Sequence, residues 1–290
     1  LAAENESELY EFLGGRKIRI GSVGNAVGGG LHSKGVKNRK PDIQEFHFIS
    51  KSKSFIENVK INDMAYKMVG RIINARKRND EGAWETDISN EEVLEAMRLV
   101  RNVMRKRGIK VEVGLDIAAN SFFNKTYRYT NPGMILNDNQ QVEYVASLIE
   151  RYNLFYVEDG LEENDFKGFS ELLKKVKKIH SKSLIVGDDL TTTNPKRLLK
   201  AIKNKSINAI IVKPNQIGSL LKVKEVIDIA KEHNVKTIIS HRSGESNDDT
   251  IADLGVGFGV DYIKTGIYGK VRRSKLKRLM KIEKKLSKRR

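Results

Sequence analysis

The sequence of 290 residues contains no cysteine, which excludes disulfide bonds and thiolate metal sites. It also has no run of about 18 apolar residues, the length that a membrane-spanning helix needs. No segment near its start has the pattern of a secretory signal peptide. We therefore expect a cytoplasmic protein that has no contact with membranes. The chain begins at Leu1 rather than at a methionine, so we expect the natural protein to start further upstream.

Acidic residues are in the minority, since 37 Asp and Glu face 54 Lys and Arg and the formal net charge is +17. One interpretation is attraction to polyanions such as RNA, or to a phosphorylated substrate. The interpretation that we favour is a lysine-rich solvated surface, as in AT-rich or heat-loving organisms. Residues 273–290 are different, because they carry ten Lys or Arg and only one acid, Glu283, around leucines at helical spacing. They predict an amphipathic helix with an outer face basic enough to contact nucleic acid.

From about residue 110 onward, short β-rich runs alternate with stretches of helical spacing. Such alternation predicts βα units and a parallel sheet. The expected strands are Val111–Ile117, Leu154–Val157, Leu184–Val186, Ala209–Val212, Thr237–Ile239 and Tyr262–Ile263. Together with the segments before them, these six units approach a closed eight-stranded α/β barrel.

The first 110 residues are organised differently. Residues 1–17 predict a helix that ends at Gly14-Gly15. Residues 18–50 contain two strand-like runs around a loop rich in glycine and lysine. Two helices, Ser54–Lys77 and Ser89–Arg107, follow them. The expected order is therefore β, β, α, α and then repeated βα units.

An ionisable residue follows each of the six later strands. These residues are Asp116, Glu158, Asp188, Lys213, His241 and Lys264, at intervals of 23 to 42 residues, or about one βα unit each. Because all strand C-termini of a barrel open on one face, we expect the six side chains to converge on one pocket. Ordinary solvation accounts for one such residue, but not for six in consecutive units.

Three consecutive members of this series are acids. Carboxylates at such close range repel one another, and a hard divalent cation resolves the conflict. Oxygen ligands without cysteine favour Mg²⁺ or Mn²⁺ over Zn²⁺. A lysine beside a bound cation has a lowered pKa, so we expect one of Lys213 and Lys264 to be a base and the other to bind an anion. Salt bridges to the acids are the alternative. Such a site suits proton abstraction α to a carboxylate, through an enediolate.

Several motifs together resemble enolase (phosphopyruvate hydratase), whose superfamily is a known example of a lysine or histidine base working with Mg²⁺. The most specific are Asp-Asp-Leu-Thr at 188–191, Asn-Gln-Ile-Gly at 215–218 and Ser-His-Arg-Ser-Gly-Glu at 240–245. The upstream half contributes Gly-Gly-Leu-His at 29–32, Gln-Glu-Phe at 44–46 and Asn-Asp-Glu-Gly at 79–82. The motif Lys-Pro-Asn-Gln-Ile-Gly at 213–218 is typical of archaeal members.

The resemblance implies an enolase-type eight-stranded barrel in residues 16–290, opening ββαα before its βα units. Residues 1–15 would be the remnant of an N-terminal capping domain of which most is absent. The implied reaction is the dehydration of 2-phosphoglycerate to phosphoenolpyruvate in glycolysis and gluconeogenesis, by a protein that forms a homo-oligomer. Lys213 would take the proton from C2, and Glu81, assisted by Glu45, would help the C3 hydroxyl leave as water.

The resemblance also implies a Mg²⁺ held by Asp116, Glu158 and Asp188. The implied substrate-binding residues are His32, on a loop that closes over the substrate, together with His241, Arg242, Ser243 and Lys264. Arg242 and Ser243 would take the phosphate, for which a guanidinium is well shaped.

The chain departs from the family pattern at several points. The loop between His32 and Glu45 is longer and basic, with a lysine at 37; Ala83-Trp84 follows the Asp-Glu-Gly motif; and residues 267–273 have lost an Ala-Arg-Ser-Glu-Arg run. Without a cap, the chemistry would face water, which weakens electrostatic interactions. The alternative function is therefore an enolase-like protein with weak or no catalysis, which binds RNA or another macromolecule through its basic surface. A sugar-acid dehydratase is a third hypothesis, which the Ser-His-Arg-Ser-Gly segment argues against.

Overall fold

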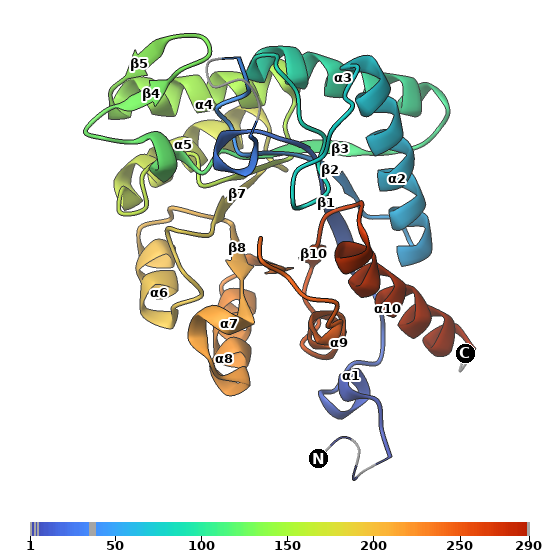
Figure 1. Ribbon diagram of the computed structural model, residues 1–290. Helices are drawn as coiled ribbons and strands as arrows, with labels where there is room; N and C mark the ends of the chain where they lie inside the picture. The colour runs from blue at the N-terminus through green and yellow to red at the C-terminus, as the bar shows by residue number, and fades with distance from the viewer. Residues whose placement is uncertain (1, 3, 5, 35–38, 289–290) are drawn as a thin grey trace.

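The computed structural model describes residues 2, 4, 6–34 and 39–288 of the chain. Lys37 of the predicted basic loop and the two terminal arginines of the predicted basic helix lie outside the described residues. Eight strands close into a barrel in the order β1-β10-β9-β8-β7-β6-β3-β2, with helices around it (Figure 1). The predicted eight-stranded α/β barrel is therefore confirmed.

The barrel strands match the apolar runs of the sequence. They are β1 (Gly21–Gly28), β2 (Glu45–Ser50), β3 (Glu112–Asp116), β6 (Tyr156–Glu158), β7 (Leu184–Gly187), β8 (Ala209–Val212), β9 (Lys236–Ser240) and β10 (Tyr262–Lys264). Only β2 runs antiparallel to its neighbours, while the other pairs are parallel. The first residue of β2 therefore lies at the end of the barrel where the other strands finish.

The helices follow the predicted order, with two of them before β3 and at least one after each later strand. They are α2 (Phe55–Ile72), α3 (Asn90–Lys106), α4 (Asp138–Tyr152), α5 (Phe166–Ile179), α6 (Pro195–Lys203), α7 (Pro214–Ile217), α8 (Leu220–Glu232), α9 (Thr250–Gly257) and α10 (Lys270–Ser287). A small hairpin between β3 and α4, formed by β4 (Tyr127–Tyr129) and β5 (Met134–Leu136), was not expected. None of the described helices combines the length and apolarity that crossing a membrane requires.

The predicted helix over residues 1–17 is confirmed only for a short stretch near its predicted end at Gly14-Gly15. Only α1 (Leu9–Phe12) is helical in the described part of this segment, and Glu8 is extended. Tertiary contacts override the helical pattern here, because the Glu8 carboxylate pairs with Arg278 and Lys285 of α10. Gly15 is required where the chain passes α9, since a Cβ there would meet Val256 O at 3.0 Å. The division of the chain at residue 15 stays a prediction.

The C-terminal segment is a helix, as predicted, and lies beside α2 (Figure 1). Its apolar face buries Leu276, Leu279 and Ile282 against the domain, so hydrophobic burial holds it in place. Part of its basic charge is neutralised internally, because several of its cations pair with acids. These residues are Arg273, Lys275, Arg278 and Lys285. Its outer face is therefore less basic than the sequence pattern indicated.

Candidate functional site

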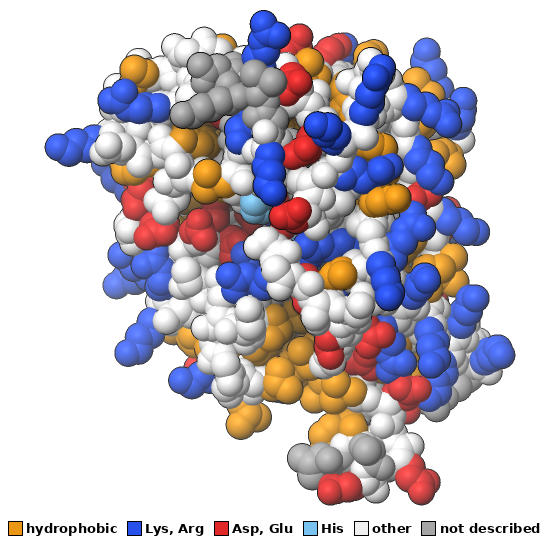
Figure 2. All heavy atoms as spheres, viewed as in Figure 1, with side chains coloured by type: hydrophobic (Ala, Val, Ile, Leu, Met, Phe, Trp, Pro, Cys, Tyr) orange, Lys and Arg blue, Asp and Glu red, His pale blue; other side chains and the backbone are white. Residues whose placement is uncertain are grey.

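A cavity of about 180 Å³ opens at the end of the barrel where the parallel strands finish. Every predicted site residue except Glu158 lines it. These lining residues are His32, Glu45, Glu81, Asp116, Asp188, Lys213, His241, Arg242, Ser243 and Lys264. In the space-filling view, a group of acidic side chains lies next to a histidine near the middle of this face (Figure 2). Five of the six strand-end residues therefore line one pocket, as expected, whereas Glu158 does not, and the roles of the residues stay predictions.

Three carboxylates form a row across neighbouring strands. Glu45 of β2 is the register partner of Asp116 of β3, which is the register partner of Glu158 of β6. Lys264, the last residue of β10, reaches all three. Its Nζ lies 3.3 Å from Glu45 Oε2, 2.9 Å from Asp116 Oδ2 and 2.8 Å from Glu158 Oε2. A single ammonium therefore offsets part of the repulsion among these carboxylates, which the sequence analysis expected a metal ion alone to offset.

Burial alone would lower the pKa of Lys264, but the charges of Asp116, Glu158 and Glu45 raise it well above its usual value. Lys264 is therefore a fixed cation at the base of the cavity. Glu158 is completely buried and does not line the cavity. Burial and the charge of Asp116 raise the pKa of Glu158 well above its usual range, and the Tyr156 hydroxyl donates a hydrogen bond to it.

A second group of acids lies at the end of β7. Ligand atoms of Asp159, Asp188 and Asp189 all lie within 4.8 Å of one another, a spacing that could hold a metal ion. The Asp159 carboxylate accepts the backbone N–H groups of Asp188 (3.0 Å) and Asp189 (2.7 Å), so it shapes this turn. Burial and the charge of Asp188 raise the pKa of Asp159 well above its usual range and that of Asp189 to about 6.

This second group was not predicted as a site. The signal in the sequence is the second acid of the pairs Glu158-Asp159 and Asp188-Asp189. The predicted trio of Asp116, Glu158 and Asp188 is not one of the groups of described residues whose ligand atoms all lie that close. Instead, Asp188 belongs to the second group, while the other two acids share Lys264.

The chemistry of these donors fits a hard divalent cation. Asp188 Oδ1 is buried and has no hydrogen-bond partner. A buried carboxylate oxygen without a partner is costly, and a cation with oxygen ligands would satisfy it. The acids around the cavity are thus able to bind a divalent metal.

Lys213 comes directly after β8. A hydrogen bond from its backbone N–H to Thr193 Oγ1 (2.9 Å) fixes the backbone at this position. Its ammonium pairs with Asp188. Burial would lower the pKa of Lys213, but Asp188 and Glu158 raise it instead. The carboxylates around the amine account for this direction, and the lowered pKa expected beside a bound cation stays a prediction. Both lysines form ion pairs with the acids, which was the alternative interpretation.

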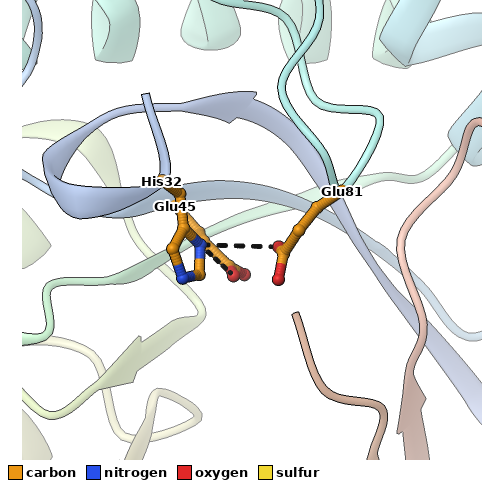
Figure 3. Close-up of side chains that lie close together, drawn as sticks. All are labelled: His32, Glu45 and Glu81. Atoms are coloured by element: carbon orange, nitrogen blue, oxygen red, sulfur yellow. Dashed lines mark ion pairs between the residues drawn. The ribbon is translucent and has the colours of Figure 1, made fainter. Parts of the chain in front are cut away.

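The imidazole of His32 points one nitrogen toward the carboxylates of Glu45 and Glu81 (Figure 3). Its Nδ1 is 3.3 Å from Glu45 Oε1 and 3.6 Å from Glu81 Oε2. Burial would lower the pKa of His32, but these two acids raise it to about 10. The pKa of Glu81 is raised by burial and by the charge of Glu45. Burial would also raise the pKa of Glu45, but Lys264, His32 and His47 lower it well below its usual value.

Two departures from the family pattern are linked through Arg78 at the loop that carries Glu81. The Arg78 guanidinium lies 3.8 Å from the centroid of the Trp84 ring and 4.0 Å from that of Tyr268. The Tyr66 hydroxyl donates to Gly82 O at 2.7 Å, directly after Glu81. Gly82 has φ +80°, and a Cβ there would meet Tyr268 O at 2.4 Å. Trp84 and Tyr268 therefore belong to one packed cluster that supports the loop of Glu81.

The turn after β9 carries the predicted phosphate-binding residues. The His241 N–H donates to Lys264 O at 3.0 Å, and Arg242 Nη1 donates to Asn215 Oδ1 at 3.2 Å. Burial and the charge of Arg272 hold the pKa of His241 well below its usual value. The sequence marked Arg272 only as a departure from the family pattern, and its contact with this turn was not predicted.

Comparison with known proteins matches residues 21–290 to the family described as "Enolase, C-terminal TIM barrel domain". The enolase of Picrophilus torridus is 40% identical over 286 residues, which cover 96% of this chain and 70% of that protein. The enolase of Pyrobaculum aerophilum is 40% identical, with 94% of this chain and 66% of that protein covered. The enolase of Archaeoglobus fulgidus is 38% identical, with 95% and 68% covered. These relatives are archaeal, in agreement with the archaeal-type motif at residues 213–218.

Proposed function

The chain belongs to the enolase family, and on this premise we propose that it is a carbon–oxygen lyase that dehydrates 2-phosphoglycerate to phosphoenolpyruvate in glycolysis and gluconeogenesis. The observation that supports this most is one cavity at the strand ends that contains a lysine, paired acids with opposite pKa shifts and an arginine–serine turn. These groups supply a base, an acid and an anion site, as the reaction requires.

Mg²⁺ is the proposed cofactor, with Asp116, Glu158 and Asp188 as its ligands. Asp188 has the best support, because one of its carboxylate oxygens is buried without a partner. Asp116 and Glu158 have weaker support, since both already contact Lys264. A bound divalent cation supplies positive charge that stabilises the negative charge developing on the substrate carboxylate.

Lys213 is the proposed base for the proton on C2 of the substrate. It can accept that proton only as a free amine, and its ion pair with Asp188 opposes this form. Any interaction that draws the Asp188 carboxylate away from the amine favours the basic form. Lys264 stays protonated in its row of acids and is proposed to bind the substrate as a fixed cation.

Glu81 is the proposed acid at C3. Its raised pKa makes this carboxyl group a more readily protonated acid than an ordinary glutamate, and in its protonated form it can give the proton to the departing hydroxyl, which leaves as water when the C3–O bond breaks. Asn25 Nδ2 donates to Glu81 Oε2 at 3.1 Å and so orients the carboxyl group. Glu45 stays ionised and holds His32, which closes the cavity from the side of its loop.

Arg242, Ser243 and His241 are the proposed phosphate ligands, since they follow one strand and line the same cavity. A homo-oligomer and a cytoplasmic location are further proposals that rest on family membership. Nucleic-acid binding through α10 has less support, because Arg273, Arg278 and Lys285 pair with acids of the same chain.

The test is an absorbance assay for phosphoenolpyruvate with the full-length natural protein, Mg²⁺ and 2-phosphoglycerate. We expect turnover in the wild type and none in Lys213→Ala. Lys203→Ala, on the exposed face of α6, is the control and should retain activity. Binding of Mg²⁺ without any turnover by the wild type would contradict the proposal.

A further inference from the structure

Arg272 is a buried arginine in the first turn of α10, and only 3% of it is exposed. Its guanidinium contacts all three residues of the turn after β9. Nη1 lies 2.6 Å from His241 Nδ1 and donates to Arg242 O at 2.7 Å, while Nη2 donates to Ser243 O at 2.7 Å. One planar side chain therefore connects α10 with a segment about thirty residues away in sequence.

The contact with His241 determines where the imidazole carries its proton. A guanidinium has five N–H donors and no acceptor, so Nδ1 of His241 must accept the hydrogen bond and carries no proton. The proton of the neutral ring is then on Nε2. His241 lines the cavity, and its Nε2 makes no hydrogen bond within the described part of the chain. The ring thus offers an N–H donor where the substrate is expected.

The charge of Arg272 has no counter-ion nearby. No carboxylate of residues 2, 4, 6–34 and 39–288 lies within 4.0 Å of its guanidinium, whereas Arg273 pairs with Asp63 and Arg278 with Asp253. A buried cation without an anionic partner costs stability. A contribution to the stability of the fold therefore does not explain why Arg272 is buried here. An anion bound at the adjacent turn would supply the missing negative charge.

On the basis of the proposed function, we propose that Arg272 is a positioning residue that fixes the phosphate-binding turn and holds His241 as the Nε2–H tautomer. Arg272 acts through His241, Arg242 and Ser243 and does not itself line the cavity. The low pKa of His241 is consistent with this, because a neutral ring can donate only from the nitrogen that keeps its proton. A lysine could not replace Arg272, since a single ammonium lacks the planar fork that reaches three acceptors at once.

The first experiment determines the tautomer in the full-length natural protein labelled with ¹⁵N-histidine. Nitrogen–proton correlation spectra distinguish a ring protonated at Nε2 from one protonated at Nδ1, and His241→Asn identifies the signal among the five histidines. We expect the wild-type ring to be neutral and protonated at Nε2 over the pH range 6 to 8, where an exposed histidine titrates at about 6.5. A ring protonated at Nδ1, or one that titrates normally, would overturn the proposal without any variant of Arg272.

The second experiment compares two neighbouring arginines. We expect Arg272→Lys to raise the KM for 2-phosphoglycerate and the dissociation constant for inorganic phosphate by about tenfold or more, and to change the His241 spectrum. Arg273→Lys, whose parent side chain pairs with Asp63 at the surface, is the control and should alter neither. Unchanged phosphate affinity and an unchanged tautomer in folded Arg272→Lys would refute the role.

Failure of this inference is distinguishable from failure of the proposed function. Absence of turnover in the wild type would contradict the lyase activity, but the tautomer and the affinity for phosphate would still decide the role of Arg272. Guanidinium ion added to Arg272→Ala provides a further test, because a positioning role predicts partial recovery of phosphate binding. A general loss of folding would not be reversed in this way.

Discussion

Glu45 and Glu81 both approach Nδ1 of His32, at 3.3 Å and 3.6 Å, yet their pKa values shift in opposite directions. The difference comes from their other neighbours. Glu45 faces Lys264 at 3.3 Å, whereas Glu81 accepts a hydrogen bond from the neutral amide of Asn25. The pKa values of two carboxyl groups in one cavity are thereby moved apart, that of Glu45 downward and that of Glu81 upward.

Glu81→Gln tests the acid directly. Glutamine keeps the shape of the side chain but cannot transfer a proton, so we expect kcat to fall by about 10² to 10⁴ while the protein stays folded. The measurement is the steady-state rate of phosphoenolpyruvate formation. Glu171→Gln, on the exposed face of α5, should leave the rate unchanged. A rate within threefold of wild type in Glu81→Gln would mean that another group supplies the proton.

The raised pKa of His32 predicts that the free energy of unfolding depends on pH. Its pKa in the folded protein is about 10, above the usual 6.5, so its pairing with the two acids stabilises the fold fully below pH 6.5. This contribution is lost as the pH rises through about 10. The free energy of unfolding, measured in denaturant for the wild type and His32→Gln, should therefore differ most at pH 6. A difference that stays constant up to pH 10.5 would contradict the raised pKa.

Asp188→Asn tests the metal site. The substitution replaces one carboxylate oxygen with an amide nitrogen and removes the negative charge of this metal ligand. We therefore expect the dissociation constant for Mg²⁺ to rise by about tenfold or more. Isothermal titration calorimetry measures this without reference to activity. Asp228→Asn, at the surface of α8, is the control. Equal Mg²⁺ affinities for both variants would place the metal elsewhere.

Glu283 tests how α10 is attached to the barrel. Its carboxylate accepts the N–H groups of Phe55 (2.7 Å) and Ile56 (2.9 Å), in the first turn of α2. Anionic acceptors at a helix N-terminus stabilise it, so Glu283→Gln should lower the free energy of unfolding by about 1 to 2 kcal/mol. Chemical denaturation measures the change, and Glu232→Gln on the exposed end of α8 provides the comparison. A loss below about 0.5 kcal/mol would show that packing alone holds α10.

The lowered pKa of Glu8 predicts a pH dependence of stability opposite to that predicted for His32. Hydrogen bonds from Arg278 and Lys285 lower the pKa of Glu8 from 4.5 to about 2. The stabilisation by these pairs is therefore present above pH 4.5 and is lost as the pH falls to about 2. The thermal midpoints of the wild type and Glu8→Gln should differ at pH 6 and coincide near pH 2. The difference in free energy should be about 1 kcal/mol or less, since the pair is partly exposed.

Much of the barrel follows from local sequence patterns. Apolar runs such as Ala209–Val212 and the helical spacing of Leu220–Ile229 depend on neighbouring residues, so they predict elements within a few positions. The residue after each strand could also be identified, because strand ends are local and a parallel barrel brings them to one face. The same reasoning succeeded only for a short stretch of residues 1–17, where the ion pairs of Glu8 with α10 come from residues about 270 positions away.

The sequence by itself determined the order of the elements, the set of residues at one end of the barrel and the family. Only the tertiary structure decided which charges meet: Lys264 with three acids, Asp188 with Lys213, and Arg272 with the turn that carries His241. Secondary structure depends mainly on contacts within a few residues. Protonation and electrostatic pairing depend on distances of 3 to 4 Å between segments far apart in the chain, which no local pattern specifies.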